Sequence, residues 1–435
     1  MRKILPTACL LALCLTGIAE AQLEIVITEG IKRRPVAIVP FGFTGDSAPA
    51  PLDVAGVIAA DLARSGRFAP TPERDMLQKP TVAADLDFSD WSILGVEAVV
   101  IGNVIQTGDN AYSVQFQLFD VFRRDQLVGF RFNDVSRGTM RRAAHRAADM
   151  IYEKLTGIKG VFDTKVAYVT AEPQGRGTLY SLIVADQDGE NAYKIMESTD
   201  PIMSPAWSPD SRRLAYVSFE GNRSSIFVQT LRTGNRIQVS SRPGINGAPA
   251  FSPDGRKLVV TLGGVDGNLD IHVLDINSRE IDRLTTHRAI DTEGSWSPDG
   301  RYIYFTSDRS GGPQIYRVPA SGGTAERITF EGSYNARPRL SPDGKKLAMV
   351  HNDRGNYRIA VLDLERRDFL VLSTGRQDES PSFAPNSDTL IYATRAGQNG
   401  VLETVTADGL IRQRLTSGRA DVREPVWSPF QLALD

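Results

Sequence analysis

The second half of the chain repeats one short phrase at a nearly constant spacing. Three of the six copies read as a bulky residue followed by Ser-Pro-Asp-Gly, the others are variants of it, and successive copies are 43 to 45 residues apart. They begin at Trp207, Phe251, Trp296, Leu340, Phe383 and Trp427. A repeat of this length is typical of one four-stranded blade of a β-propeller. The phrase therefore predicts an all-β ring of repeated sheets.

The composition of the phrase indicates a tight turn between two strands. Proline fixes φ near −65° and suits the second position of such a turn. The serine and aspartate side chains can hydrogen-bond nearby backbone amides, and glycine accepts a positive φ at little cost. An apolar, β-rich run follows each copy, such as Leu214–Val217 or Ile303–Phe305. Each phrase is thus expected to join the innermost strand of a blade to the second strand.

Counting strands predicts how the ring closes. Only seven residues follow Ser428 in the last copy, too few for three more strands. The missing strands are found upstream of the first copy, at Val166–Val169, Leu179–Val184 and Ala192–Met196. We therefore expect a six-bladed propeller over residues 165–435, with a closing blade split between its start and its end. Such a closure leaves no open sheet edge at the seam.

The first 21 residues have the pattern of an export signal. Arg2 and Lys3 precede the apolar run Leu5–Ile18, which is too short to span a bilayer comfortably. Ala19-Glu20-Ala21 is a small-residue cleavage site, so the mature chain is expected to begin at Gln22. The sequence predicts a soluble protein exported to the periplasm.

Both cysteines lie inside this signal. A lipoprotein signal ending at Cys14 is the weaker alternative, because Leu13 occupies the position where a small residue is expected. Cleavage after Ala21 would remove both Cys9 and Cys14, so the mature chain is expected to have no thiol. Disulfides, cysteine metal ligands and cysteine nucleophiles are excluded together.

Residues 22–157 show mixed α and β patterns and predict an N-terminal α/β domain, followed by a linker at 158–164. Strands are expected at Val36–Val39, Glu97–Ile105, Tyr112–Leu118 and Gln126–Phe132, with helices from Asp53 to Gly66 and from Met140 to Gly157. The mature terminus, Gln22–Thr28, reads as a short strand. It is either an edge strand of its own domain or a free strand offered to a partner.

The sequence contains no recognisable catalytic or metal-binding motif. The four histidines, His145, His272, His287 and His351, lie in different segments without metal-ligand spacing. Nucleophile elbow, P-loop and dinucleotide fingerprint are missing. Asp186–Asn191 resembles a calcium loop but lacks the later glutamate, so a turn between strands is expected. We expect no cofactor and no metal.

The net charge of −2 gives no electrostatic reason to expect binding to nucleic acid or to an anionic membrane. A protein-binding adaptor is the leading class. One alternative is a secreted propeller enzyme, a lyase or hydrolase, with charged groups of shifted pKa in its channel. Another is a glycan-binding propeller, which aromatic residues at the channel mouth would favour.

Propeller topology places the loops that lead into the inner strands around one mouth of the channel. The phrase turns and the turns between third and fourth strands lie on the opposite face. The channel-face loops are polar and glycine-rich, as expected of a binding surface. The candidate contact residues on this face are Asn246, Gly247, Ala248, Thr292, Glu293, Arg337, Glu379 and Glu424.

An export signal, a small α/β domain and six W-S-P-D-G units with a split last blade together resemble the TolB family of the Tol–Pal cell-envelope system. The resemblance covers essentially the whole chain, and Asn246–Gly255 is similar to the second unit of the family. The sequence departs from the pattern at Ala384–Ser387 and at Phe430. Both departures are expected to affect turns and not the channel face.

The resemblance implies a monomeric, non-enzymatic periplasmic adaptor that supports outer-membrane integrity and constriction at cell division. It implies that the channel face binds Pal, the peptidoglycan-associated lipoprotein of the outer membrane, and that colicins use the same surface. It implies that the N-terminal region binds TolA. We expect the TolA contact at Gln22, Leu23, Glu24, Ile25, Val26, Ile27 and Thr28, which would extend the sheet of TolA by β-augmentation.

Overall fold

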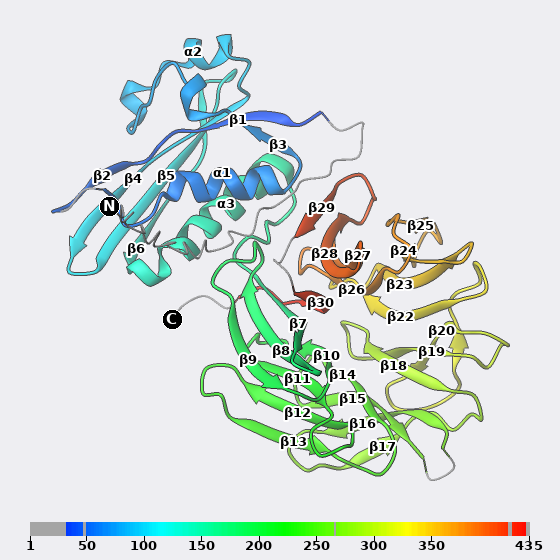
Figure 1. Cartoon of the computed structure of the whole chain (residues 1–435). Coiled ribbons are helices and arrows are strands. Elements are labelled where there is room, and N and C mark those ends of the chain that lie inside the picture. Colours follow the sequence, from blue (N-terminus) through cyan, green and yellow to red (C-terminus); the bar gives the residue numbers. More distant parts are fainter. Residues whose placement is uncertain (1–31, 47–48, 265–266, 416–419, 432–435) are drawn as a thin grey trace, which may run out of the picture.

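The computed structural model describes residues 32–46, 49–264, 267–415 and 420–431. Its first part is an α/β region, and its second part is a ring of β-sheets (Figure 1). The predicted signal 1–21 and the predicted strand 22–28 lie outside the described residues. No helix among the described residues is both long enough and apolar enough to span a membrane.

The α/β region is built on one mixed sheet. Its strand order is β3 (Phe68–Pro70), β1 (Arg34–Ile38), β4 (Ala98–Gly108), β5 (Ala111–Asp120) and β6 (Asp125–Val135), and β2 (Gly42–Thr44) also pairs with β4. β1 runs parallel to β3 and β4, whereas β4, β5 and β6 are antiparallel. The helices are α1 (Val54–Arg64), α2 (Phe88–Ile93) and α3 (Met140–Thr156), with 3₁₀ turns at Glu73–Asp75, Ala83–Asp85 and Arg137–Thr139.

Local sequence sets the ends of the helices, as predicted. The Asp53 side chain accepts a hydrogen bond from the Gly56 amide at 2.9 Å and caps α1. α3 ends at Gly157, whose φ of 75° an L-residue adopts only at a cost. α1 and α3 pack side by side on one face of the sheet (Figure 1). Trp91 of α2 is fully buried in a second apolar cluster with strand residues such as Val99.

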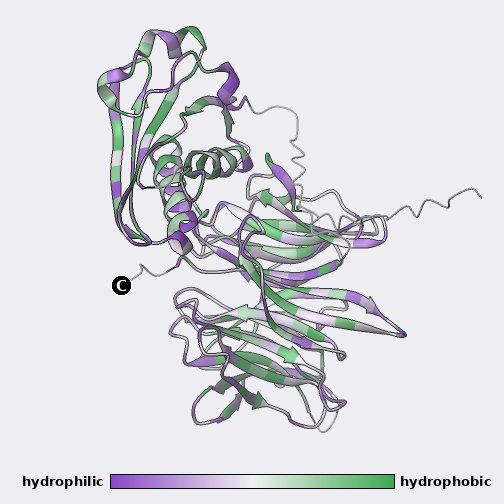
Figure 2. Ribbon diagram, turned by 60° about the vertical axis from the view of Figure 1, so that its left-hand side comes forward, coloured by the Kyte–Doolittle hydropathy of each residue, from purple (hydrophilic) through white to green (hydrophobic). Residues whose placement is uncertain are grey.

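The described residues of the second part form six four-stranded sheets, which confirms the predicted six-bladed propeller. Five blades are continuous in sequence. They are β10 (Ile202–Trp207), β11 (Arg213–Ser218), β12 (Ser225–Thr230), β13 (Arg236–Ser240); β14 (Asn246–Phe251), β15 (Lys257–Gly263), β16 (Leu269–Asp275), β17 (Ile281–Arg283); β18 (Asp291–Trp296), β19 (Tyr302–Ser307), β20 (Gln314–Pro319), β21 (Glu326–Arg327); β22 (Asn335–Leu340), β23 (Lys346–Asp353), β24 (Asn356–Asp363), β25 (Phe369–Val371); and β26 (Glu379–Phe383), β27 (Thr389–Ala396), β28 (Asn399–Thr406), β29 (Arg412–Leu415). Figure 2 shows hydrophobic residues, in green, along the strands of these sheets. Their buried side chains form clusters between neighbouring blades.

The sixth blade is split, as predicted. Its inner strand is β30 (Asp421–Trp427), which pairs with β7 (Lys165–Gln174) and is followed by β8 (Gly177–Asp186) and β9 (Tyr193–Ser198). The indole nitrogen of Trp427 donates to the Thr164 hydroxyl at 2.8 Å, and the Ser428 amide donates to the Lys165 carbonyl at 2.8 Å. Hydrogen bonds between the two ends of the repeat region therefore close the ring.

The repeated phrase folds as a turn held by its own side chains. In the third copy, the Ser297 hydroxyl donates to Asp299 at 2.6 Å, and the Asp299 carboxylate accepts from the Arg301 amide at 3.0 Å. These hydrogen bonds lower the pKa of Asp299 to about 2. The same serine–aspartate pair occurs in the first, second and fourth copies.

The α/β region lies against the face that carries these turns, and the two departures from the pattern are among the contacts. Asn386 of the fifth turn donates to the Lys159 carbonyl at 3.0 Å, and Arg67 pairs with Asp388 at 3.2 Å. The Lys159 ammonium lies 5.8 Å from the centre of the Phe430 ring. The prediction that these departures concern only turns is therefore incomplete, because both help to seat the α/β region.

Candidate functional site

The channel of the propeller is lined by a ring of irregular backbone positions. The pairing of each inner strand with its neighbour shifts register once, as at a β-bulge. One non-glycine residue at each shift has a positive φ between 47° and 59°. These residues are Ser204, Ala248, Glu293, Arg337, Ser380 and Glu424. Because a left-handed non-glycine residue costs about 1 kcal/mol or more, six equivalent cases mark a constrained site.

Polar contacts connect five of the six members of this ring, and four of them meet at Arg337. The Glu293 carboxylate accepts from the backbone nitrogen of Arg337 at 3.0 Å and from its Nε at 2.8 Å. Arg337 also donates to the Ser380 hydroxyl, and its Nη2 lies 3.9 Å from Glu424. Although burial opposes the charged form, Glu424 and Glu293 raise the pKa of Arg337. The guanidinium therefore stays charged and links its own blade to three others.

A second arginine fills the layer below this ring. The residues two positions further along each inner strand are small, except at one blade: Ala206, Ala250, Ser295, Arg339, Ser382 and Val426. Arg339 donates through Nη1 to the Pro338 carbonyl at 2.9 Å, and burial lowers its pKa. Arg339 lines a cavity together with Arg337.

Two adjoining cavities open at this level, and both are lined by Glu293 and Arg337. The larger has a volume of about 450 Å³ and includes Glu379 in its lining. The smaller has a volume of about 200 Å³ and is lined by Gly247, Ala248, Thr292 and Glu424 among others. The structure thus brings seven of the eight predicted channel-face residues to the walls of two cavities, where each is half-buried.

Asn246, the eighth predicted residue, has a different place. It has no exposed surface, and its Oδ1 accepts from the Arg242 amide at 3.0 Å, while its Nδ2 donates to the Arg242 carbonyl at 2.7 Å. Asn246 therefore braces the loop 241–245 and offers no surface to a partner in this conformation. Equivalent positions in the next three blades hold buried polar residues, namely Asp291, Asn335 and Asp378.

The rim above the cavities is apolar on one side and polar on the other. Ile245 and Ile290 directly precede two inner strands, and their side chains are 48% and 47% exposed. Gln377 and Asp421 occupy the equivalent places around the fifth and sixth blades. Ile245 also lines the smaller cavity, so this side of the rim offers apolar surface next to the polar ring.

Sequence reasoning missed several residues of this site. Ser204, Ser380 and Arg339 belong to the channel layers, and Tyr334 and Tyr357 line the larger cavity with ring centres 5.2 Å apart. Ser204, Ser380 and Arg339 could have been found from the repeat, because they lie at fixed offsets before the phrase when the six units are aligned. Tyr334 directly precedes β22, at the repeat position that Ile245 and Ile290 hold in other blades, whereas Tyr357 lies in β24.

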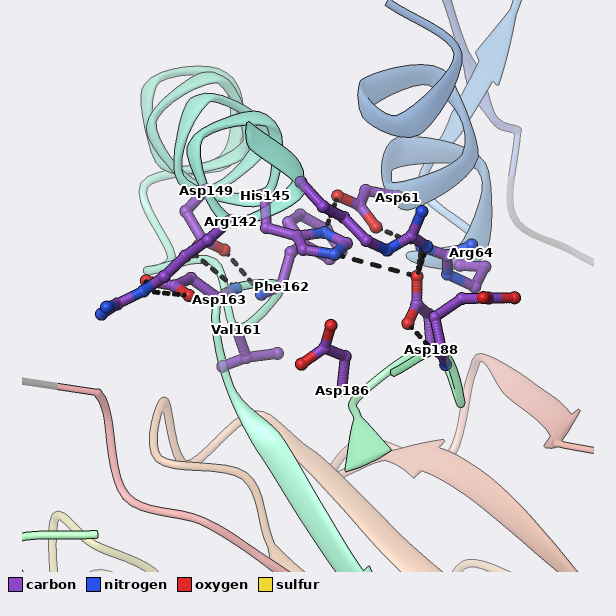
Figure 3. A network of polar contacts seen from close by, with 12 residues as sticks. Asp61, Arg64, Arg142, His145, Asp149, Val161, Phe162, Asp163, Asp186 and Asp188 are labelled. Atoms are coloured by element: carbon purple, nitrogen blue, oxygen red, sulfur yellow. Dashed lines mark hydrogen bonds and ion pairs between the residues drawn. The ribbon is translucent and has the colours of Figure 1, made fainter. Parts of the chain in front are cut away.

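A second polar cluster lies between the α/β region and the propeller (Figure 3). Asp61, His145 and Asp188 each place one potential ligand atom within 4.8 Å of the others. Sequence spacing did not indicate this group, because its members come from three distant segments. Arg64 and Arg141 both pair with Asp188, and Arg64 also pairs with Asp61. Two guanidiniums at these carboxylates oppose a cation, so the cluster is an ion-pair network.

The fold and the channel define a class: six-bladed propellers that carry an α/β region on one face and a polar, loop-lined channel mouth on the other. Comparisons identify the family within this class. The TolB amino-terminal domain matches residues 23–127, and the TolB beta propeller domain matches residues 152–431. The chain belongs to the TolB family.

Relatives are similar over nearly the whole chain. The Tol-Pal system protein TolB of Nitrosococcus oceani is 52% identical over 411 residues, 94% of both chains. The protein of the same name from Xanthomonas oryzae pv. oryzae is 46% identical over 427 residues, 97% of both chains. The crystal structure of TolB from Acinetobacter baumannii superposes with a TM-score of 0.85 at 41% identity, covering 94% of this chain and all of that one. A role in the Tol-Pal system follows, and none of these names indicates a catalytic activity.

Proposed function

We propose that this chain is a periplasmic adaptor of the Tol-Pal system that binds Pal at the channel face and TolA through residues 22–28. In this role it links the outer membrane to TolA, and so supports outer-membrane integrity and constriction at cell division. Colicins are further candidates for the channel face. Family membership supports a role in the Tol-Pal system. The position of the channel face, away from the α/β region, supports the proposal that Pal and TolA bind at different places.

The observation that carries the proposal is the position of the braced ring opposite the α/β region. Buried side chains such as Asn246 and Asp378 fix the loops that surround it. A preformed, rigid loop cluster loses little conformational entropy when a partner binds. The exposed Ile245 and Ile290 then supply apolar contact, and the half-buried polar ring supplies specificity.

The channel carboxylates favour binding over catalysis. Glu293 accepts hydrogen bonds from Arg337 and from the Thr306 hydroxyl, and Glu424 accepts from the Ser204 amide at 2.5 Å. Both carboxylates are held as acceptors in an ion-paired ring, whereas general acid–base catalysis needs a group free to exchange a proton with substrate. The ring is better suited to recognise backbone and side-chain polar groups of a partner.

The channel-face assignment is tested by placing a charge on each face of the propeller. Thr292→Arg puts a long cation into the smaller cavity, and Thr324→Arg puts the same cation in an exposed turn on the opposite face. Titration calorimetry with purified Pal should show at least a tenfold weaker affinity for Thr292→Arg and an affinity within twofold of wild type for Thr324→Arg. Equal affinities for the two variants would refute the assignment.

The TolA assignment is tested by deleting residues 22–28 from the mature chain. Binding to the periplasmic domain of TolA should be lost, while Pal binding is retained within about twofold. TolA binding that survives the deletion would move the contact to another part of the α/β region.

A glycan ligand is the second candidate, favoured by Tyr334 and Tyr357 at the larger cavity. Tyr357 is 39% exposed, but the two rings meet edge to face, at 75°, and present no shared flat platform for a sugar. Peptidoglycan fragments tested in the same calorimeter distinguish the ligands. Saturable binding that Tyr357→Ala abolishes would favour the glycan.

A further inference from the structure

One propeller turn inserts a carboxylate into the α/β region. Asp188, in the turn between β8 and β9, has a side chain only 1% exposed. Its Oδ1 accepts from the Glu190 amide at 3.1 Å, which fixes the turn, and its Oδ2 faces the cations of the other region (Figure 3). Arg64 of α1 lies 3.2 Å from this oxygen, and Arg141 of α3 also pairs with it. Asp188 is thus the propeller's contribution to a charged socket.

A histidine lies between this carboxylate and a second one. His145 of α3 is 2% exposed, and its Nδ1 is 2.7 Å from Asp61 Oδ2. Its Nε2 is 3.9 Å from Asp188 Oδ2 and makes no hydrogen bond within the described part of the chain. A neutral imidazole can donate to only one of the two carboxylates, whereas an imidazolium donates toward both.

His145 lies among charges of both signs. The groups that face this cluster are Asp61 and Arg64 on α1, Arg141, Arg142, Arg146 and Asp149 on α3, Asp163 in the connecting segment, and in the propeller Asp188 and Asp186, the latter paired with Lys165. The carboxylates closest to the imidazole are those of Asp61 and Asp188, one at each ring nitrogen. A protonated His145 is therefore attracted on both sides, whereas a neutral one leaves Asp188 without this cation.

We infer that Asp188 and the protonated form of His145 make a proton-dependent clamp that holds the α/β region against the turn face of the propeller. Burial lowers the pKa of His145, but Asp61 and Asp188 outweigh it and raise the pKa overall. Of these two carboxylates only Asp188 belongs to the propeller, so its attraction is the part that makes the docked arrangement bind the proton more tightly than a separated one. The contribution is fully present below the ordinary histidine value of about 6.5 and is lost as the pH rises through the raised pKa.

The clamp goes beyond the proposed function, because it controls how the two partner-binding parts are held together and not what either part binds. The contacts around Asn386 and Phe430 remain when the clamp opens. The expected result of opening is a wider range of positions for the α/β region, with both regions still folded. The periplasm follows the external pH more closely than the cytoplasm does, so the clamp would respond to the medium.

Spin-label distances in the mature chain test the clamp. The mature sequence has no cysteine, so Lys154→Cys and Asp408→Cys place one label on each exposed side of the contact without competing thiols. Pulsed electron paramagnetic resonance should give one short distance at pH 5.5 and a severalfold larger share of long distances at pH 8.5. His145→Gln keeps a donor for Asp61 but cannot be protonated, so its distances should not change with pH.

Two further variants complete the test. Asp188→Asn removes the propeller carboxylate without touching either apolar core, and should show long distances at both pH values. His287→Gln, at an exposed loop histidine, should behave as wild type. The clamp is overturned if His145→Gln keeps the wild-type pH response, or if wild type gives a single distance at every pH. Pal affinity of His145→Gln is measured separately, and its loss would count against the proposed function instead.

Discussion

Glu293 accepts two hydrogen bonds from Arg337, one from the backbone nitrogen at 3.0 Å and one from Nε at 2.8 Å. The two residues are equivalent positions of neighbouring blades, and both have left-handed backbones. The side chain of one repeat unit therefore holds the bulge of the next. The same arrangement recurs at two other bulges, where the Ser204 amide donates to Glu424 and the Glu293 amide donates to the Thr261 hydroxyl of the neighbouring blade. Hydrogen bonds of this kind help the strained backbone to persist around the channel.

Replacing Arg337 should loosen this ring. Arg337→Met keeps the apolar stem but leaves Glu293 and Glu424 without their shared cation in a half-buried site. We expect a loss of about 2 kcal/mol in the free energy of unfolding, because the carboxylates lose charged hydrogen bonds. Urea denaturation measures the loss, and Pal affinity should fall with it.

Arg354→Met is the matched control for this variant. The Arg354 side chain is 95% exposed and lies 3.9 Å from Asp353. An exposed pair of this kind contributes about 0.5 kcal/mol or less. Equal destabilisation by the two substitutions would show that the ring does not depend on Arg337.

Asn246→Ala should act on the loop that Asn246 braces and not on a direct contact. The Arg242 amide and carbonyl both lose their partner, and so does the buried Ser240 hydroxyl, whose loss alone costs about 1–3 kcal/mol. Pal affinity should fall because the loop 241–245 becomes less ordered. Exchange of the loop amides with deuterium should therefore speed up in the variant, whereas Asn235→Ala, in an exposed turn, should leave it unchanged.

The fold could be predicted from the sequence because its signals are local and repeated. Four copies of the phrase hold their own turn by a serine–aspartate hydrogen bond such as Ser297–Asp299, and six copies or variants at one spacing specify the ring. The channel residues were predictable from topology alone, since loops of one kind must share a face. Asn246 differs from the other seven predicted residues in being buried, and sequence does not distinguish a polar side chain that faces outward from one that turns inward to its own loop.

The contact between the two regions could not be predicted in the same way. Asp188 lies in a turn whose sequence is equally compatible with exposure to solvent and with burial against another region. Its partners Arg64 and Arg141 are far away in sequence. A hint was present at Asn386, where the phrase departs from its pattern. Its meaning depends on Lys159, which no local rule connects to it.

Asp149 should make stability depend on pH. Its two carboxylate oxygens accept from the amides of Phe162 and Asp163 at 2.7 and 3.0 Å, yet burial raises its pKa to about 7. Between pH 4 and 7 the folded chain holds a proton that the unfolded chain has released. The contribution of this site to stability should therefore decrease as the pH rises through that window, by at most about 1.4 kcal/mol per pH unit, and level off above pH 7.

Comparing wild type with Asp149→Asn isolates this effect, since other titrating groups are common to both. The difference between their unfolding free energies should change between pH 4 and 7 and stay constant from pH 7.5 to 9. A difference that is flat across the whole range would show that Asp149 does not carry the proton.

Restoring the consensus at the fifth turn should destabilise the chain. Asn386→Asp recovers the aspartate of the repeated phrase, and a consensus substitution usually stabilises. Here the Asn386 amide group donates to the Lys159 carbonyl at 3.0 Å, and a carboxylate cannot donate. We expect a loss of about 1 kcal/mol, because the Lys159 carbonyl loses its donor and faces a like-signed oxygen. Urea denaturation of the full mature chain measures it.

A propeller that lacks residues 22–164, provided that it folds on its own, is the control for this variant. In that protein the Lys159 contact is absent, so Asn386→Asp should be neutral or stabilising. A gain in stability in the intact chain would instead mean that Asn386 serves its turn and not the contact with the α/β region.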